Sequence, residues 1–145
     1  MPSNANSSLN ADTNSGTAMV RTRPCVLVIE DNPDMREFLR RVLDKRGYDY
    51  LGAEDGIEGM DLALRERPDL VLMDLSLPAL DGYEATRLLK AHPDFASIPI
   101  LAVTAHAREV DHAHALEVGC DGYLSKPYSI RQLFDLIAQH LPLDK

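Results

Sequence analysis

The sequence contains no tryptophan, only two cysteines and no long run of hydrophobic residues. None of its apolar segments approaches the roughly 18 residues that a membrane-spanning helix needs, and the amino terminus lacks the hydrophobic core of a signal peptide. Cys25 and Cys120 lie far apart and form no CxxC motif, so we expect two reduced thiols and neither a disulfide nor a metal site. These absences favour a cytoplasmic protein without a membrane segment.

Basic residues are also scarce relative to acidic ones. The chain has 15 Lys and Arg against 23 Asp and Glu, which gives a formal net charge of −8. Nucleic acids and anionic membranes attract positive charge, so this balance argues against both as partners. We expect the partners to be proteins.

The length of 145 residues suits one domain with a single sizeable core. Residues 1–23 are rich in Ser, Asn, Ala and Thr and have almost no large apolar side chains. Such a segment cannot offset the entropy lost on ordering, so we expect a disordered tail there. The folded domain is expected over residues 24–145.

Beyond Pro24, short apolar runs alternate with segments of helical periodicity. This alternation is typical of βα units that build a parallel sheet, and the right-handed crossover rule places helices on both of its faces. The strands are expected at residues 26–31, 48–53, 69–74, 98–103 and 122–125. We therefore predict an α/β fold, a doubly wound five-stranded parallel sheet with five helices.

Cap signals and apolar periodicity define the five helices. The predicted N-terminal signals are Asn32-Pro33, Asp55 with Glu58, Asp81 with Glu84, and Ser129 with Gln132, and the predicted stops are Gly47, Pro68 and Pro93. The predicted buried stripes are Met35, Phe38, Leu39, Val42 and Leu43 on the first helix, Ile57, Met60 and Leu64 on the second, and Ile130, Leu133, Phe134, Ile137 and Leu141 on the last. The fourth helix, at 109–118, has a thin apolar face and is a candidate partner-facing element.

Three acidic residues, Glu30, Asp31 and Asp74, close two of the apolar runs. In open α/β sheets, ligands bind beyond the carboxyl ends of the strands where the strand order reverses. If the first and third strands are neighbours, the three carboxylates converge. Two like charges about 4 Å apart repel by roughly 4 kcal/mol at an effective dielectric near 20, so the cluster needs a cation or a raised pKa. Bound Mg²⁺ is the economical answer, whereas Asp34 is better interpreted as an acid that favours the helix dipole.

From Val26 to Leu141 the sequence resembles the receiver domains of two-component response regulators. The resemblance rests on features that occur in the family's order. They are Glu30-Asp31 after the first strand, Asp74 with Pro78 and Asp81-Gly82 after the third, Thr104-Ala105 after the fourth, and Lys126-Pro127 after the fifth. The resemblance implies a flavodoxin-like fold with strand order 2-1-3-4-5.

The same resemblance implies the roles of the site residues. Asp74 would be the phosphoryl acceptor, and Lys126 would pair with the transferred group, directed inward by a cis bond to Pro127. Mg²⁺ or Mn²⁺ would be held by Glu30, Asp31, Asp74 and the carbonyl of Ser76. Thr104 would hydrogen-bond the phosphoryl group, Tyr123 would be the switch aromatic, and Ser76 and His106 would tune the lifetime of the phosphorylated state.

Simpler interpretations of these residues stay open. Thr104 and Tyr123 suit ordinary strand packing, Lys126 could be a solvated lysine before a turn, and Asp74 could be a turn aspartate. His112 and His114 are two residues apart and fall on different helix faces, so a solvated role is better supported than a metal site for them and for His106.

The resemblance implies a stand-alone phospho-receiver, a regulatory protein and not an enzyme, although it would support its own phosphotransfer and slow autodephosphorylation. Because the chain ends soon after Lys126-Pro127, we expect no separate output domain. Output would pass through the face formed by the fourth helix, fifth strand and fifth helix. The expected partners are a sensor histidine kinase or histidine phosphotransfer protein and a downstream protein target, with a homodimer as a possibility.

Three other functions are alternatives to this one. A phosphorelay intermediate, which passes the phosphoryl group onward, is the nearest one. An aspartate-nucleophile phosphatase would need an Asp-x-Asp pair on the first strand, but Glu30 and Asp31 are adjacent and Asp74 lies on the third. A degenerate receiver that only binds partners is disfavoured because Asp74, Thr104 and Lys126 are all retained.

Overall fold

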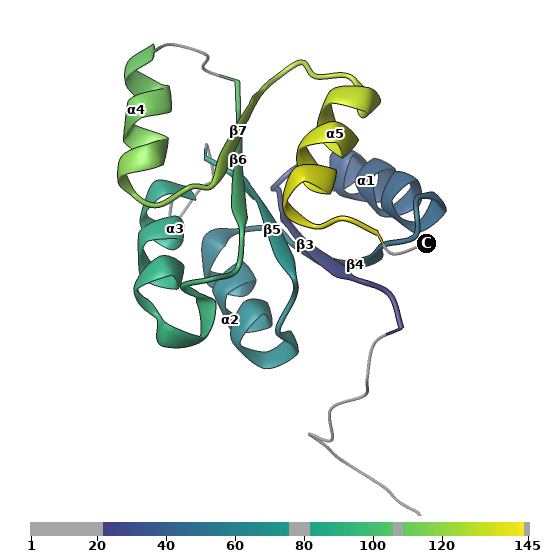
Figure 1. Cartoon of the computed structure of the whole chain (residues 1–145), viewed down its shortest axis with the longest axis horizontal. Helices are drawn as coiled ribbons and strands as arrows, with labels where there is room; N and C mark the ends of the chain where they lie inside the picture. Colours follow the sequence, from purple (N-terminus) through teal and green to yellow (C-terminus); the bar gives the residue numbers. More distant parts are fainter. Residues whose placement is uncertain (1–21, 76–81, 106–108, 144–145) are drawn as a thin grey trace, which may run out of the picture.

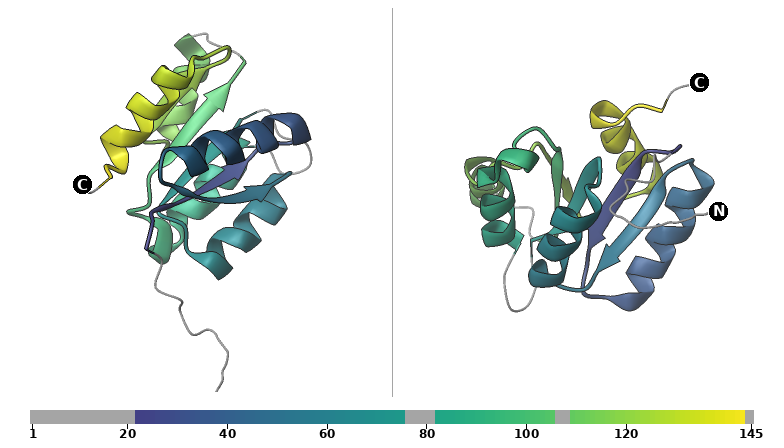
Figure 2. Two further views of the ribbon diagram at one scale, coloured as in Figure 1. Left: turned by 90° about the vertical axis from the view of Figure 1, so that its right-hand side faces the viewer. Right: turned by 90° about the horizontal axis from the view of Figure 1, so that it is seen from below.

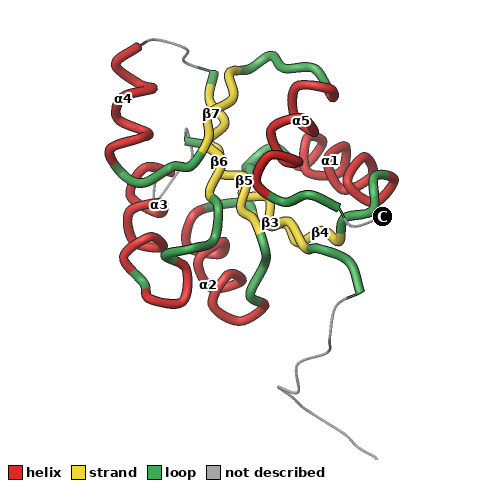
Figure 3. The backbone as a smooth tube through the Cα atoms, viewed as in Figure 1, coloured by secondary structure: helices red, strands yellow, loops and turns green. Residues whose placement is uncertain are grey.

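The computed structural model describes residues 22–75, 82–105 and 109–143, with backbone only for 109–112. Its centre is a sheet of five parallel strands in the order β4-β3-β5-β6-β7 (Figure 3). The strands are β3 (Cys25–Ile29), β4 (Asp49–Ala53), β5 (Leu70–Asp74), β6 (Ile100–Thr104) and β7 (Gly122–Ser125). Counted along the chain, this order is the predicted 2-1-3-4-5, and the flavodoxin-like fold is confirmed.

Five helices cover the two faces of the sheet. They are α1 (Pro33–Lys45), α2 (Gly56–Glu66), α3 (Gly82–Ala91), α4 (Glu109–Glu117) and α5 (Ile130–His140), and a short 3-10 turn, η1 (Pro93–Phe95), follows α3. α1 and α5 lie on one face, and α2, α3 and α4 lie on the other (Figures 1 and 2). The predicted doubly wound architecture is therefore correct.

The three central strands, β3, β5 and β6, are buried along their whole length, which explains their nearly continuous apolar sequences. Along β3, Leu27 and Ile29 belong to the core under α2, α3 and α4, whereas Val26 and Val28 belong to the core under α1 and α5. Successive side chains of a strand point to opposite faces. Each central strand thus packs against both helical layers.

Several helix caps match the sequence signals. The Asn32 side chain accepts hydrogen bonds from the backbone N–H groups of Asp34 and Met35, and Ser129 and Gln132 form a reciprocal capping box. At α2 the predicted pairing of Asp55 with Glu58 in a capping box is only half correct. Asp55 accepts from the Glu58 N–H, but the Glu58 carboxylate accepts from the N–H of Glu54, one residue before the cap. The Asp81 cap lies outside the described residues.

The buried stripe predicted for α2 is correct only at Met60, which is partly buried against the core. Ile57 is 62% exposed and Leu64 is 40% exposed, and the buried positions are Gly56, Gly59 and Ala63. Small residues face the sheet because the helix lies very close to it, and a Cβ added at Gly59 would be 2.4 Å from Ile29 Cδ1. Ile57 and Leu64 are therefore turned outward.

Phe38 on α1 was also predicted to be buried and is 44% exposed. The deeper contacts of α1 come from Leu39 and Leu43, with Met35 and Val42 at the margin of the same core. On α5 the predicted stripe is correct, because Leu133, Phe134 and Ile137 are buried and Ile130 and Leu141 pack against them. Phe38 thus lies beyond the edge of the apolar stripe of α1.

Strand ends differ from the predictions by one or two residues. The first strand ends at Ile29, which leaves Glu30 and Asp31 in the loop beyond it. The fourth begins at Ile100 and not at 98, because the Ile98 N–H donates to the Phe95 carbonyl in the turn after η1. Both cysteines are buried thiols that form no disulfide, and burial raises the pKa of the Cys120 thiol to about 11.

Arg23 lies at the end of the predicted tail but contacts the domain. Its guanidinium forms ion pairs with Asp44 at 3.1 Å and Asp49 at 3.3 Å, and it also donates to the Tyr48 carbonyl. Contacts with the domain therefore begin at least one residue before Pro24. Among the described residues, no helix is long and apolar enough to span a membrane.

Candidate functional site

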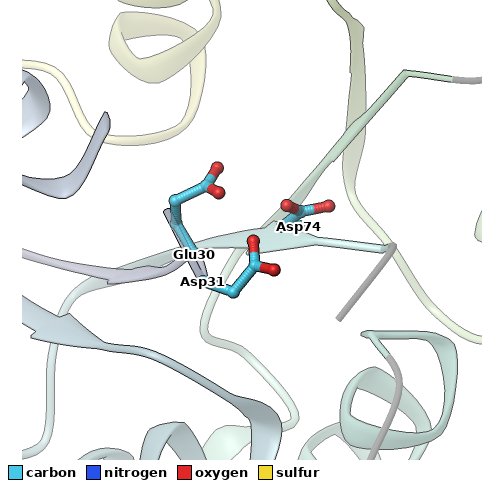
Figure 4. A group of neighbouring side chains, drawn as sticks. All are labelled: Glu30, Asp31 and Asp74. Atoms are coloured by element: carbon cyan, nitrogen blue, oxygen red, sulfur yellow. The ribbon is translucent and has the colours of Figure 1, made fainter. Parts of the chain in front are cut away.

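Three acidic residues meet at the carboxyl edge of the sheet. β3 and β5 are parallel neighbours, with Ile29 opposite Met73, so Glu30 and Asp31 follow one strand beside the Asp74 that ends the other. One carboxylate oxygen from each residue lies within 4.8 Å of those from the other two. Figure 4 shows the three side chains gathered in one small region. The predicted convergence of these acids is confirmed.

The three carboxylates differ in their access to water. Glu30 is 5% exposed and Asp74 is 6% exposed, whereas Asp31 is exposed. Two buried acids therefore form the base of the cluster, and Asp31 borders the solvent. Burial raises the pKa of Glu30, and the nearby charge of Asp74 reinforces this increase. The Asn32 N–H, which donates to the Glu30 carboxylate at 3.1 Å, partly offsets it.

A lysine from the far end of the sheet balances part of this charge. Lys126 Nζ lies 3.2 Å from Glu30 Oε1 and 3.4 Å from Asp74 Oδ2. Burial disfavours the ammonium, but the charges of Asp74 and Glu30 outweigh that effect and raise the pKa of Lys126. The Lys126-Pro127 bond is cis, as the sequence led us to expect. One lysine next to three carboxylates leaves an excess of negative charge.

Oxygen ligands around excess negative charge suit a hard divalent cation such as Mg²⁺ or Mn²⁺. Glu30, Asp31 and Asp74 each offer one carboxylate oxygen to such an ion. The residues present therefore fit the metal that the sequence led us to expect. The Ser76 carbonyl, a further expected ligand, lies outside the described residues.

Thr104 and Tyr123 lie on the neighbouring strands β6 and β7. Thr104 is buried at the end of β6, and the Lys126 N–H donates to its carbonyl at 2.7 Å. Tyr123 pairs with Ala102, two residues before Thr104, so the two side chains are on the same face of the sheet. Tyr123 is half-buried against the core under α2, α3 and α4. This arrangement is compatible with both a switch role and ordinary packing.

The remaining predicted residues have varied positions. Asp34 is exposed in the first turn of α1, as expected for an acid that favours the helix dipole. His114 stacks on Tyr83, with ring centroids 4.1 Å apart and an interplanar angle of 9°. His106 lies outside the described residues, and so does the side chain of His112.

Sequence reasoning missed two residues at this site. Tyr128 lines a small hollow together with Glu30 and Asp74, and its position two residues after Lys126 could have identified it. Arg36 on α1 donates from Nη1 to the Glu30 carbonyl at 2.7 Å. A bond from a side chain to a backbone carbonyl has no sequence pattern, so no signal pointed to Arg36.

Comparison with known proteins identifies the family. The model of the response regulator receiver domain matches residues 26–138. The chain belongs to this family. The match therefore covers most of the chain. It includes all residues of the five described strands except Cys25, the first residue of β3.

Individual relatives agree with this assignment. The polar-differentiation response regulator DivK of Brucella anthropi is 37% identical over 116 residues, which cover 80% of this chain and 94% of that protein. The receiver domain of the sensor histidine kinase PA1611 from Pseudomonas aeruginosa was solved with a magnesium ion in its active site cleft. It is 35% identical to this chain, with a TM-score of 0.76, and the match covers 82% of this chain and 98% of that one. Chemotaxis protein CheY4 of Vibrio cholerae is 25% identical with a TM-score of 0.79, covering 83% and 100%.

Proposed function

We propose that this receiver domain accepts a phosphoryl group on Asp74 from a sensor histidine kinase or a histidine phosphotransfer protein. The observation that supports this most directly is the convergence of Glu30, Asp31, Asp74 and Lys126 at one edge of the sheet. Phosphoryl transfer depends mainly on positioning and on neutralising charge. The strand ends position Asp74, and Lys126 together with a divalent cation held by the acids would neutralise the charge.

In this proposal the Asp74 carboxylate is the nucleophile. One of its oxygens forms a bond to phosphorus while the bond between phosphorus and the donor's imidazole nitrogen breaks, and that nitrogen keeps the electron pair. Lys126 Nζ, 3.4 Å from Asp74 Oδ2, is close enough to pair with the incoming phosphoryl oxygens. Its raised pKa keeps it charged at neutral pH.

Glu30, Asp31, Asp74 and the Ser76 carbonyl are the proposed ligands of Mg²⁺ or Mn²⁺. The bound ion would neutralise charge on the acids and on the phosphoryl oxygens. Thr104 is the proposed hydrogen-bond donor to the phosphoryl group, Tyr123 the proposed switch aromatic, and Ser76 and His106 the proposed modulators of its lifetime. The phosphorylated domain would signal to a downstream protein through the surface of α4, β7 and α5, on which a homodimer could also form.

The domain boundaries and the location belong to the same proposal. Residues 24–145 would be the receiver domain, and the cytoplasm would be the compartment in which it meets its kinase. The expected disordered tail falls mostly on residues 1–21, which lie outside the described residues. As a regulatory protein, it would contribute its own phosphotransfer and slow dephosphorylation and act on no other substrate.

Phosphorylation with a small-molecule donor tests the assignment. The protein is incubated with Mg²⁺ and a phosphoramidate, and acid-stable, base-labile phosphate is mapped by mass spectrometry. Wild type should carry one such phosphate, on Asp74, and Asp74→Asn should carry none while keeping its fold. Asp61→Asn is the matched control, because Asp61 is exposed on α2 and paired with Arg65. Equal phosphate on Asp74→Asn would refute the assignment.

A further inference from the structure

Arg36 anchors the loop that contains two of the acidic residues. It lies in α1, six residues after Glu30, and its Nη1 donates to the Glu30 carbonyl at 2.7 Å. That carbonyl belongs to the peptide group that joins Glu30 to Asp31. Its orientation therefore determines the directions from which both side chains leave the backbone.

Three further hydrogen bonds hold the same loop. The Glu30 N–H donates to the Ala53 carbonyl at 3.0 Å, and the Asn32 N–H donates to Glu30 Oε2 at 3.1 Å. The Arg36 N–H donates to the Asn32 carbonyl, also at 3.0 Å. Glu30 is thus held at its N–H, its carboxylate and its carbonyl, and Arg36 provides the bond at the carbonyl.

The surroundings of Arg36 differ from those of the next arginines on α1. Arg36 is half-buried and lies near Tyr50 on β4, whose pKa is raised by burial and lowered in part by the Arg36 charge. The Tyr50 ring lies over Gly52, where an added Cβ would be 2.1 Å from the phenol oxygen. In contrast, Arg40 is exposed and pairs with Glu37.

We propose that Arg36 is a positioning residue for the metal site, one that sets the affinity for Mg²⁺ by fixing the peptide between Glu30 and Asp31. This inference rests on the proposed function. A guanidinium near a cation site opposes cation binding by charge alone. If Arg36 nevertheless raises the affinity, it must do so through the hydrogen bond that holds the ligands in place.

This opposition of the two effects makes substitution informative. Arg36→Met keeps a long apolar side chain beside Tyr50 but removes both the charge and the donors. A role in positioning predicts Mg²⁺ binding about ten-fold weaker than in wild type, which corresponds to about 1.4 kcal/mol. A role through charge alone predicts tighter binding. Arg36→Lys keeps the opposing charge but lacks the planar fork, so it should also bind Mg²⁺ more weakly than wild type.

The measurements are isothermal titration calorimetry with Mg²⁺ and amide hydrogen exchange over residues 30–36 without metal. Both Arg36 variants should bind Mg²⁺ more weakly and exchange faster in this segment. Arg40→Ala, which removes an arginine one helical turn away, should match wild type in both. If Arg36→Met does not fold, the test rests on Arg36→Lys. Unchanged Mg²⁺ binding and unchanged hydrogen exchange in that variant would overturn the proposal.

The outcomes separate this inference from the proposed function. Wild type that binds Mg²⁺ and accepts phosphate, with Arg36→Met binding equally or more tightly, would overturn only the role of Arg36. Wild type that binds no Mg²⁺ would overturn both the proposed metal site and this inference. Weaker binding by the Arg36 variants with unchanged binding by Arg40→Ala would support the inference.

Discussion

Lys126 Nζ lies 3.2 Å from Glu30 Oε1, although the two residues are 96 positions apart in the sequence. The same Nζ is 3.4 Å from Asp74 Oδ2. Both carboxylates are buried, so removal of the lysine charge leaves them facing each other in a poorly solvated place. The stability of the metal-free protein should depend on this lysine.

We predict that Lys126→Met lowers the free energy of unfolding in metal-free buffer by about 1–3 kcal/mol, less than the loss of a partner from a fully buried ion pair. Mg²⁺ should restore part of the difference, because the ion can replace the missing positive charge. Urea denaturation with and without Mg²⁺ measures both effects. A variant as stable as wild type without metal would show that the lysine contributes no net stabilisation.

The raised pKa of Glu30 predicts how stability varies with pH. The folded chain holds the Glu30 proton more tightly than the unfolded chain, in which the pKa is near its ordinary 4.5. The stabilisation from this proton is therefore complete below 4.5 and is lost as the pH rises through the folded pKa. In metal-free buffer, wild type should gain stability relative to Glu30→Gln as the pH falls from 7 toward 5.

Chemical denaturation of both proteins at several pH values measures that difference. Hydrogen bonds from Arg40 and Arg41 lower the pKa of Glu37 to about 2, so its contribution to stability has the opposite pH dependence. Glu37 is present in both proteins, and its contribution therefore cancels in the difference between them. Mg²⁺ should reduce the difference, because it favours the ionised carboxylate. A constant difference across this pH range would contradict a raised Glu30 pKa.

Mg²⁺ should stabilise the folded protein through its acidic ligands. At ten times its Kd, a ligand that binds only the folded state adds about 1.4 kcal/mol. Asp31→Ala should lose most of this gain, because the exposed Asp31 contributes one of the three clustered carboxylates. Thermal denaturation with increasing Mg²⁺ measures the effect.

Asp34→Ala is the matched control for that experiment. Asp34 is also an exposed aspartate near the start of α1, but it is not one of the three clustered acids. Its variant should keep the full stabilisation by Mg²⁺. A comparable loss in both variants would mean that general negative charge, and not ligation by Asp31, accounts for the effect.

Thr104 should couple phosphorylation to the surface that contains Tyr123. A shift from 1% to 99% of the active state needs about 5.5 kcal/mol of differential stabilisation, and charge-assisted hydrogen bonds to the phosphoryl group are a suitable source. Beryllofluoride bound at Asp74 should change hydrogen-exchange protection over residues 104–125 in wild type. Thr104→Ala should bind the mimic without that change.

Thr104→Ser controls for the loss of the methyl group, because it keeps the hydroxyl. It should respond to beryllofluoride as wild type does. An equal response in Thr104→Ala would exclude the threonine as the coupling residue. If no protein responds, the domain transfers phosphate in a relay and does not act as a conformational switch.

The sequence predicted the sheet and most caps because these depend on local patterns. Continuous apolar runs marked the strands, and the acids placed directly after them had to meet once β3 and β5 became neighbours. The order of the strands came from the family resemblance. Periodicity alone does not determine which strands pair.

The failures have a common physical cause. On α2, an apolar stripe of Ile57, Met60 and Leu64 was predicted, but the closest approach to the sheet is made by small residues such as Gly59, and Ile57 and Leu64 are exposed. That distance is a property of the packed structure and not of the helix sequence. The Arg36 bond to Glu30 escaped prediction for the same reason, since it depends on how α1 lies over the end of β3.

The placement of the site on three strands also affects the order in which it forms during synthesis. Glu30 and Asp31 follow β3, Asp74 ends β5, and Lys126 follows β7, which lies at the edge of the sheet and pairs with β6. The ribosome therefore makes all three acids well before it makes their lysine. A nascent chain that has not yet docked β7 has no Lys126 beside Asp74, so the complete cluster of three acids and one lysine cannot form until this edge strand is in place.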